Sequence, residues 1–276
     1  MNRYTSVVAA CLLFACGCAS AQRKADAGSS EGPPNFFEVQ QYDQPFAGWA
    51  EPTIWSTYVG SSSQREQHFD QDHPRQGLWA HSLELEYGVT DRLALGAYVD
   101  VVDPPGGDAR YAQTRLLARY RFSNRQELFF NPALYVEYYL PHGGYGDRRL
   151  ETRLILDKDV GDFRFVANPS VSVTTSGDNA WGAPSIGLAG AVYWRRPVLA
   201  QPGIEYYADY GQWNDQGHSK QYLLPTVDIA LTPNVVWHIG AGFGLTSGSD
   251  HAVVETQLRF EYDVVRPSHL FGHPFQ

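Results

Sequence analysis

Residues 83–102, LELEYGVTDRLALGAYVDVV, alternate between apolar and polar side chains on both sides of a short turn. Successive side chains on a β-strand point to opposite faces. Leu83 and Leu85 of the first arm therefore share a face, and Leu95 lies on the equivalent face of the second arm. Gly88 and Asp91 supply turn residues between the arms. The pattern predicts a hairpin whose apolar face meets either a second sheet or lipid.

The same alternation continues along the chain in segments separated by Gly, Pro, Asn and Asp. We predict twelve strands, near residues 48–60, 77–88, 92–102, 110–122, 127–140, 148–159, 163–175, 184–195, 202–211, 220–231, 235–246 and 252–265. Strands of soluble proteins average about five or six residues. A tilted membrane strand needs about 9–11 residues, which these segments reach.

The predicted connections alternate between long and short along the chain. The long ones are residues 61–76, 103–109, 141–147, 176–183, 212–219 and 247–251, and the short ones are 89–91, 123–126, 161–162, 196–201 and 232–234. Outer-membrane barrels have short periplasmic turns and longer external loops, whereas a soluble sandwich has no reason to alternate. The sequence therefore predicts an all-β protein, a transmembrane antiparallel β-barrel of about 12 strands.

The N-terminus has the features of an export signal. A short apolar core ends in Ala19-Ser20-Ala21, so residues 1–21 form the predicted signal peptide, with cleavage after Ala21. Cleavage there would remove all the cysteines of the chain, Cys11, Cys16 and Cys18. The alternative is a lipoprotein signal, with the anchor at Cys16 or Cys18.

Three further regions complete the predicted organisation. Residues 22–46 are polar, aperiodic and rich in Gly, Ser and Pro, and form a periplasmic arm or linker. This arm could also enter the barrel as a plug anchored by Phe36 and Phe37, because twelve strands enclose more room than eight. Residues 47–265 form the barrel, and residues 266–276 form a C-terminal tail.

Composition supports the strand-rich interpretation and restricts the partners. Aromatic residues make up 14% of the chain, which also has 26 glycines, as expected for strands and turns. The net charge of −9 and the absence of a basic run argue against nucleic-acid binding. The predicted partners are outer-membrane lipid and a small-molecule solute, and the sequence leaves the oligomeric state open.

The predicted inward faces carry an uneven distribution of charge. A basic wall on neighbouring strands would comprise Arg115, Arg119, Arg121, Arg149, Arg153 and Arg164. An acidic wall on the opposite side would comprise Glu84, Glu86, Glu205, Asp209, Asp228, Glu255 and Glu261. Charges buried without water or partners are costly. The walls therefore predict either a water-filled pore that selects ions or a fully paired, salt-bridged interior.

Candidate catalytic chemistry is sparse. The sequence contains no G-x-S-x-G, H-E-x-x-H or P-loop motif. The strand histidines, His81 and His238, have no obvious serine partner in the sequence, so we predict no enzyme, no catalytic residues and no cofactor. One external loop contains His68, Asp70, Asp72 and His73, a set that could bind Zn²⁺ or Cu²⁺.

The hairpin EYGVTDRLALGAYVDV resembles a recurring hairpin of the outer-membrane barrels grouped as the meta-pathway phenol-degradation transporter family. The match covers residues 84–101, and the twelve predicted strands extend it loosely. The resemblance implies a bacterial outer-membrane channel or facilitator for passive passage of small, often aromatic or hydrophobic compounds. The alternatives are a closed structural or adhesive barrel and a surface enzyme that uses the Asp/His loop.

Overall fold

The structure is a computed structural model that describes residues 36–69, 71–196, 199–216 and 219–264. The predicted signal peptide, the first part of the arm and the C-terminal tail lie outside the described residues. Within these ranges, no helix is long and apolar enough to cross a membrane.

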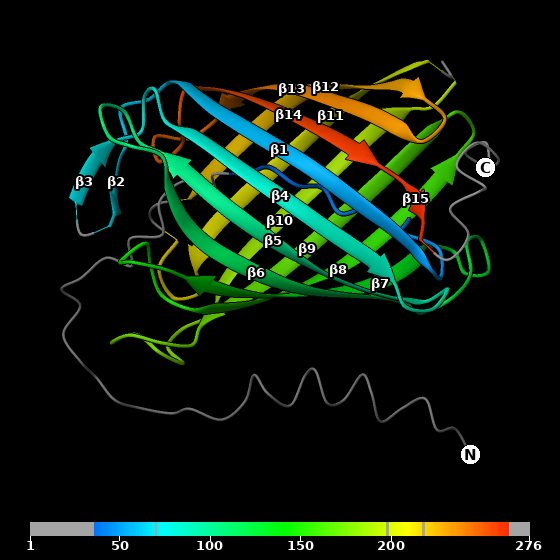
Figure 1. Cartoon of the computed structure of the whole chain (residues 1–276), viewed down its shortest axis with the longest axis horizontal. Coiled ribbons are helices and arrows are strands. Elements are labelled where there is room, and N and C mark those ends of the chain that lie inside the picture. The colour runs from blue at the N-terminus through cyan, green and yellow to red at the C-terminus, as the bar shows by residue number, and fades with distance from the viewer. Residues whose placement is uncertain (1–35, 70, 197–198, 217–218, 265–276) are drawn as a thin grey trace. The chain divides into compact units, whose positions relative to one another are not determined.

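Twelve long strands form a closed antiparallel sheet (Figure 1). They are β1 (Trp49–Ser61), β4 (Trp79–Gly88), β5 (Leu93–Asp103), β6 (Arg110–Arg121), β7 (Asn131–Pro141), β8 (Arg149–Val160), β9 (Phe163–Thr174), β10 (Ser185–Trp194), β11 (Ala200–Gln212), β12 (Lys220–Thr232), β13 (Val235–Gly244) and β14 (Ala252–Phe260). Each strand pairs with the next, and β14 pairs with β1 through a register that places Ile54 opposite Leu258. The predicted fold class, an all-β barrel of twelve strands, is confirmed.

Three short strands lie outside this ring. β2 (Arg65–His68) and β3 (Gln71–Pro74) form a hairpin inside the long loop between β1 and β4, which the sequence pattern did not predict. β15 (Tyr262–Asp263) continues the last strand and pairs with the start of β1. The barrel therefore begins and ends at the same rim, opposite the rim that carries the β2–β3 hairpin (Figure 1).

Most predicted strand limits lie within two residues of the observed ones, and two differ by more. The strand predicted over 127–140 begins at Asn131, because the Asn131 side chain accepts a hydrogen bond from the Gln126 backbone N–H (2.6 Å) and closes a turn. The turn between β6 and β7 is consequently longer than expected. The strand predicted over 252–265 is interrupted after Phe260, where the Glu261 N–H donates to the Asn234 carbonyl (3.0 Å).

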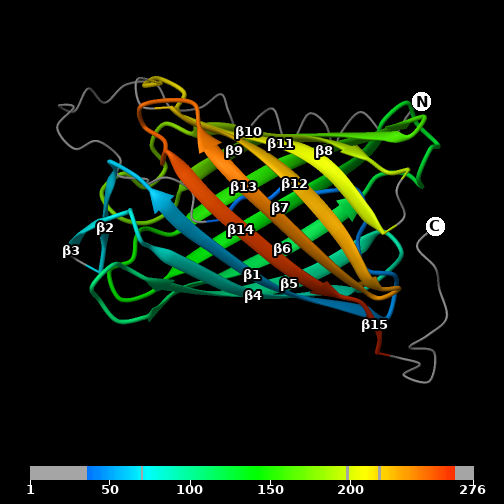
Figure 2. The same cartoon turned by 90° about the horizontal axis from the view of Figure 1, so that it is seen from above.

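The two faces of the barrel differ as the alternation predicted. Leu95 is 46% exposed on the outer surface, whereas its neighbour Ala94 is fully buried inside. Large apolar side chains are exposed on the outer faces of most of the twelve strands. These strands run around the whole ring (Figure 2). An outer surface of this kind suits lipid, because soluble monomers rarely expose contiguous apolar patches of such extent.

A charge on the outer face should destabilise the barrel in proportion to its depth in the bilayer. Leu83 lies near the middle of β4 and is 55% exposed, while Tyr87 lies on the same face beside the end of the strand. We expect Leu83→Arg to lower the free energy of unfolding by about 2–4 kcal/mol, and Tyr87→Arg by about 0–1 kcal/mol from the charge itself. Urea titrations of barrels refolded in lipid vesicles measure both, and equal costs would contradict the depth assignment.

Candidate functional site

The barrel interior is occupied by residues 36–46, which enter it as an extended segment before β1 begins (Figure 1). We call this stretch the plug segment. Phe37 is fully buried, with its ring edge-on to the rings of Tyr207 (centroids 5.3 Å apart) and Tyr222 (4.8 Å). Edge-to-face aromatic pairs add about 0.5–1.5 kcal/mol to ordinary burial. Phe37 therefore anchors the segment to β11 and β12.

Asn168, on the inner face of β9, holds the middle of the plug segment. The Gln40 backbone N–H donates to Asn168 Oδ1 (2.7 Å), and Asn168 Nδ2 donates to the Gln40 carbonyl (2.9 Å). One side-chain amide thus supplies both hydrogen bonds that a neighbouring strand would supply. Two residues further on, the Tyr42 N–H donates to Asp157 of β8 (3.0 Å).

Three arginines of the predicted basic wall contact the plug segment. Arg119 donates to the Asp43 carbonyl (2.6 Å) and to the Gln40 side chain. Arg164 pairs with the Asp43 carboxylate (2.9 Å), and Arg153 lies 3.7 Å from the Glu38 carboxylate. Guanidinium groups present several donors in a fixed geometry, which suits them to bind carbonyls and carboxylates together. These arginines therefore use residues of the predicted linker as partners, which the strand pattern alone did not indicate.

Gly88, at the end of β4, allows the backbone of Pro45 and Phe46 to pass close to it just before β1 begins. A Cβ atom at Gly88 would lie 2.1 Å from the Phe46 carbonyl oxygen and 2.5 Å from that of Pro45. The Gly48 N–H donates to the Gly88 carbonyl (2.8 Å) at the same crossing. Gly88 ends β4 without a positive φ, so the close approach of another chain segment is what requires the glycine of the EYGVTD hairpin.

The remaining basic residues have their hydrogen-bond and ion-pair partners on the barrel itself, although Arg115 and Arg121 also lie 5.3 Å from the ring centres of Phe36 and Tyr42 in the plug segment. Arg115 pairs with Asp100 and Glu137, each at 2.8 Å, and its guanidinium lies 3.7 Å from the centre of the Tyr98 ring. Arg149 lies over the Tyr139 ring (4.0 Å) and 3.7 Å from Glu151, and Arg121 donates to the Asp91 carbonyl.

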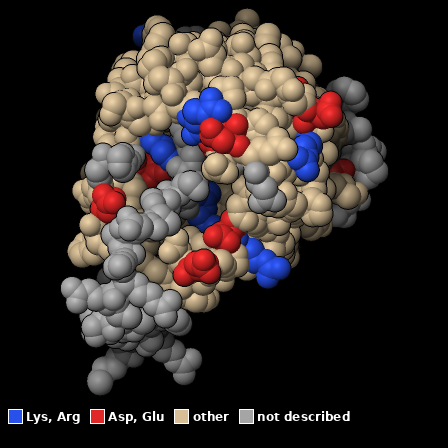
Figure 3. All heavy atoms as spheres, turned by 90° about the vertical axis from the view of Figure 1, so that its left-hand side faces the viewer, with Lys and Arg blue, Asp and Glu red and all other residues tan. Residues whose placement is uncertain are grey.

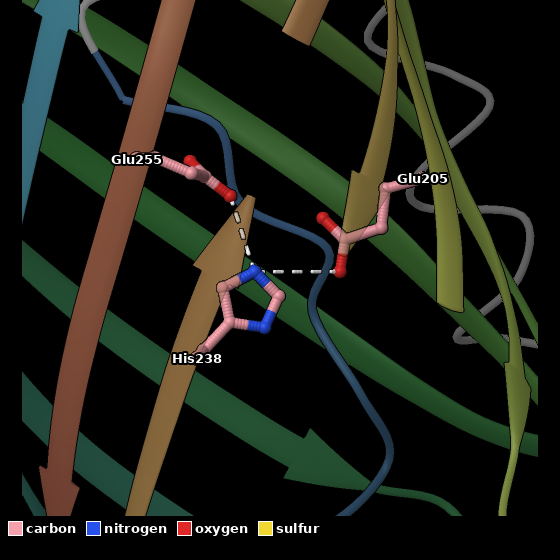
Figure 4. A group of neighbouring side chains, drawn as sticks. All are labelled: Glu205, His238 and Glu255. Carbon is pink, nitrogen blue, oxygen red and sulfur yellow. Dashed lines mark hydrogen bonds and ion pairs between the residues drawn. The ribbon is translucent and has the colours of Figure 1, made fainter. Parts of the chain in front are cut away.

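The predicted acidic wall separates into isolated contacts and one cluster. Glu86 lies 3.3 Å from Arg119, and Glu84 accepts a hydrogen bond from the Trp55 indole (3.0 Å). Asp209 lies 3.9 Å from Lys220, and Glu261 lies beyond the end of β14. The structure brings the other three, Glu205, Asp228 and Glu255, together around His238. Figure 4 shows Glu205 and Glu255 on either side of the His238 ring. The sequence placed the three acids on one side of the barrel but did not predict that they meet, or that His238 lies among them.

A buried ion pair joins two loops at the rim that carries the β2–β3 hairpin. Arg75, which follows β3, is fully buried and binds Asp250 of the β13–β14 loop (2.9 Å) and Glu66 of β2. Burial alone would lower the pKa of Arg75, but the carboxylates of Glu66 and Asp250 raise it above its usual value. At this end of the barrel, acidic and basic side chains of the described residues lie next to one another on the surface (Figure 3).

The structure describes only part of the metal-binding set predicted in the β2–β3 loop. Asp72 pairs with Arg65 (2.5 Å), and His73 lies one residue further on in β3. The side chains of His68 and Asp70 lie outside the described residues. Asp72 therefore has a local partner, and metal binding by this loop stays a prediction.

The expectation that the strand histidines lack a serine partner was wrong for His81. Ser56 on β1 lies opposite His81 on β4, and Ser56 Oγ is 2.9 Å from His81 Nδ1 on the outer face. A catalytic histidine normally has a third group that orients its ring. Among the described residues, no carboxylate or amide is hydrogen-bonded to His81. The pair satisfies two polar groups on an apolar face, beside the Trp79 ring stacked on the imidazole.

No family model and no curated protein matches the sequence. The fold is similar to solved outer-membrane barrels. An outer-membrane channel from Pseudomonas putida F1 is 13% identical with a TM-score of 0.58, covering 82% of this chain and 100% of that chain. The KdgM porin, solved in complex with disordered oligogalacturonate, has a TM-score of 0.53 and 7% sequence identity with this chain. That match covers 76% of this chain and 98% of the porin chain. The TM-scores show a shared fold, and at these low identities they show the fold alone.

Removing the Asn168 amide should loosen the plug segment without opening the sheet. Asn168→Leu leaves the buried N–H and carbonyl of Gln40 without partners, which costs about 1–3 kcal/mol. We expect faster hydrogen exchange at the Gln40 and Tyr42 amides, measured by mass spectrometry. Exchange across β5 is the internal control, because Asn168 lies on β9; unchanged exchange in the plug segment would contradict its attachment through Asn168.

The buried ion pair should control access to the loop before β4. Arg75→Met leaves Glu66 and Asp250 without the guanidinium, and breaking a buried pair this way costs about 3–5 kcal/mol. We expect a lower melting temperature and faster protease cleavage within residues 62–78. The triple variant with Glu66→Gln and Asp250→Asn removes the stranded charges and should recover part of the loss. Equal cleavage of parent and Arg75→Met would show that the pair does not fasten the loop.

Proposed function

We propose that the protein is an outer-membrane channel for passive passage of small molecules, and that the plug segment restricts the path. The observation that carries this proposal is how the interior is filled. A separate segment occupies it, held by hydrogen bonds and ion pairs to Asn168, Arg119 and Arg164. A smaller barrel of about eight strands can fill its interior with strand side chains instead. The similarity of the fold to an outer-membrane channel and a porin supports the same class.

The surfaces behind the plug segment suggest the solute class. Tyr98 and Tyr135 line the interior beside Arg115 and Arg119, whose guanidiniums lie 3.7 Å and 5.6 Å from the respective ring centres. Aromatic rings and guanidinium groups together favour small aromatic or otherwise weakly polar compounds that carry an acceptor group. This agrees with the resemblance of the EYGVTD hairpin to the phenol-degradation transporter family.

The proposed location follows from the outer surface and the N-terminus. The apolar outer face suits the lipid of a bacterial outer membrane. Export would use residues 1–21 as a cleaved signal peptide, with lipid attachment at Cys16 or Cys18 as the alternative. Enzymatic activity is not part of the proposal, because His81 and Ser56 have no third partner among the described residues.

Deleting residues 22–44 should increase the conductance of the barrel in planar bilayers, because it removes Phe37, Gln40 and Asp43 from the lumen. The parent is expected to conduct weakly, and swelling of liposomes with neutral and charged solutes should rise in parallel. Phe37→Ala combined with Asn168→Leu provides a milder release of the segment, with folding checked by heat-dependent migration in gels. If parent, deletion and double variant all fold and none conducts, the protein is a closed structural barrel.

A further inference from the structure

We propose that Glu205, His238 and Glu255 bind a divalent transition-metal ion in the barrel wall. The three side chains come from β11, β13 and β14 and point toward one another (Figure 4). One potential ligand atom from each lies within 4.8 Å of the others, and all three residues are buried. This site is separate from the contacts of Asn168 and the arginines with the plug segment, and the inference does not depend on transport.

The distances suit a small metal ion after little adjustment. His238 Nε2 lies 3.2 Å from a Glu255 oxygen and 3.8 Å from a Glu205 oxygen. Ligands at the usual Zn–N and Zn–O lengths, in tetrahedral geometry, are separated by roughly 3.3 Å. The histidine and Glu255 are already at this separation, whereas the Glu205 oxygen, 3.8 Å from Nε2 and within 4.8 Å of the Glu255 ligand atom, has to move closer to both.

The residues around the cluster orient its candidate ligands. His238 Nδ1 lies 2.6 Å from Asp228 Oδ1, so the aspartate can hold the ring with Nε2 directed at the two glutamates. The Tyr193 and Tyr207 hydroxyls each donate to Glu205, both at 2.5 Å. Metal-binding histidines commonly donate their second ring nitrogen to a carboxylate, and metal-binding carboxylates are themselves hydrogen-bonded. The cluster has both features.

The cluster also has an excess of negative charge. Three carboxylates share one imidazole, and no lysine or arginine of the described ranges forms an ion pair with any of the three. Glu255 is 2% exposed, yet its Oε2 has no hydrogen-bond partner in the described part of the chain. Buried acceptors without partners are costly. A bound dication would satisfy this oxygen and balance most of the charge.

Two glycines allow the cluster to form. A Cβ at Gly203 would lie 2.4 Å from the Tyr193 ring, and one at Gly240 would lie 3.2 Å from Glu255 Cγ. Tyr193 therefore reaches Glu205 by lying across β11, and Glu255 reaches His238 by lying across β13. A mixed set of one nitrogen and carboxylate oxygens suits Zn²⁺ and Mn²⁺ better than a copper(I) or iron–sulfur centre.

Zinc titration of the full chain tests the inference. After chelator treatment, the refolded parent is titrated with Zn²⁺ by calorimetry, and bound zinc is counted by mass spectrometry. We expect one zinc per chain at this site and a higher melting temperature when it binds. His238→Gln and Glu255→Gln should abolish that binding, and Asp228→Asn should weaken it by about 10–100-fold. His81→Gln is the matched control and should bind as the parent does.

The outcomes separate this site from the loop histidines. Zinc binding that persists equally in His238→Gln and Glu255→Gln, but disappears in His73→Gln, would assign the metal to the external loop and overturn the proposal. The absence of saturable zinc and Mn²⁺ binding to the folded parent would also overturn it, without reference to any variant. The cluster would then be a set of hydrogen-bonded acids and a histidine. Conductance has no part in these readouts, so a failure here leaves the channel proposal unaffected.

Discussion

The structure depends on satisfying charged side chains in an enclosed space. Twelve strands enclose an interior too wide for their own side chains to close by apolar contact, and these strands direct arginines and glutamates inward. A guanidinium buried there needs acceptors on several sides, and a single facing carboxylate leaves donors unused. Arg115 obtains its acceptors from Asp100 and Glu137 of neighbouring strands. Arg119 and Arg164 obtain theirs partly from the plug segment.

The plug segment is therefore part of the interior and not simply a tether. It combines one apolar anchor, Phe37, with a series of polar contacts to Asn168 and the arginines. Hydrogen bonds and ion pairs of this kind exchange readily for bonds to water or solute. The strands of the barrel are held more firmly, because a shift of one strand by one residue would move all its side chains to the opposite face of the sheet. In the proposed channel, this difference would let the segment move while the barrel stays closed. The Arg75 ion pair provides a comparable attachment at the mouth.

The acidic cluster around His238 differs from the rest of the interior, because its carboxylates have no guanidinium partner in the described part of the chain. Tyrosine hydroxyls and one imidazole stabilise it instead. Its place in the wall, next to Tyr207, connects it with the aromatic contact of Phe37. The interior thus contains two kinds of charged region, one neutralised by arginine and one that attracts a cation.

The sequence by itself determined the strands, their two faces and the ring of twelve, because these depend on a two-residue period and on loop lengths that are local properties of the chain. It also placed Arg119, Arg164, Glu205 and Glu255 on the inner face. It did not indicate which charged residues meet: Glu205, His238 and Glu255 are far apart in the chain and come together only through strand register and ring closure. The docking of Gln40 on Asn168, the pairing of Arg75 with Asp250 and the contact of Ser56 with His81 likewise join distant segments. These contacts were decided by the tertiary structure, because side-chain alternation carries no information about the partner across the barrel.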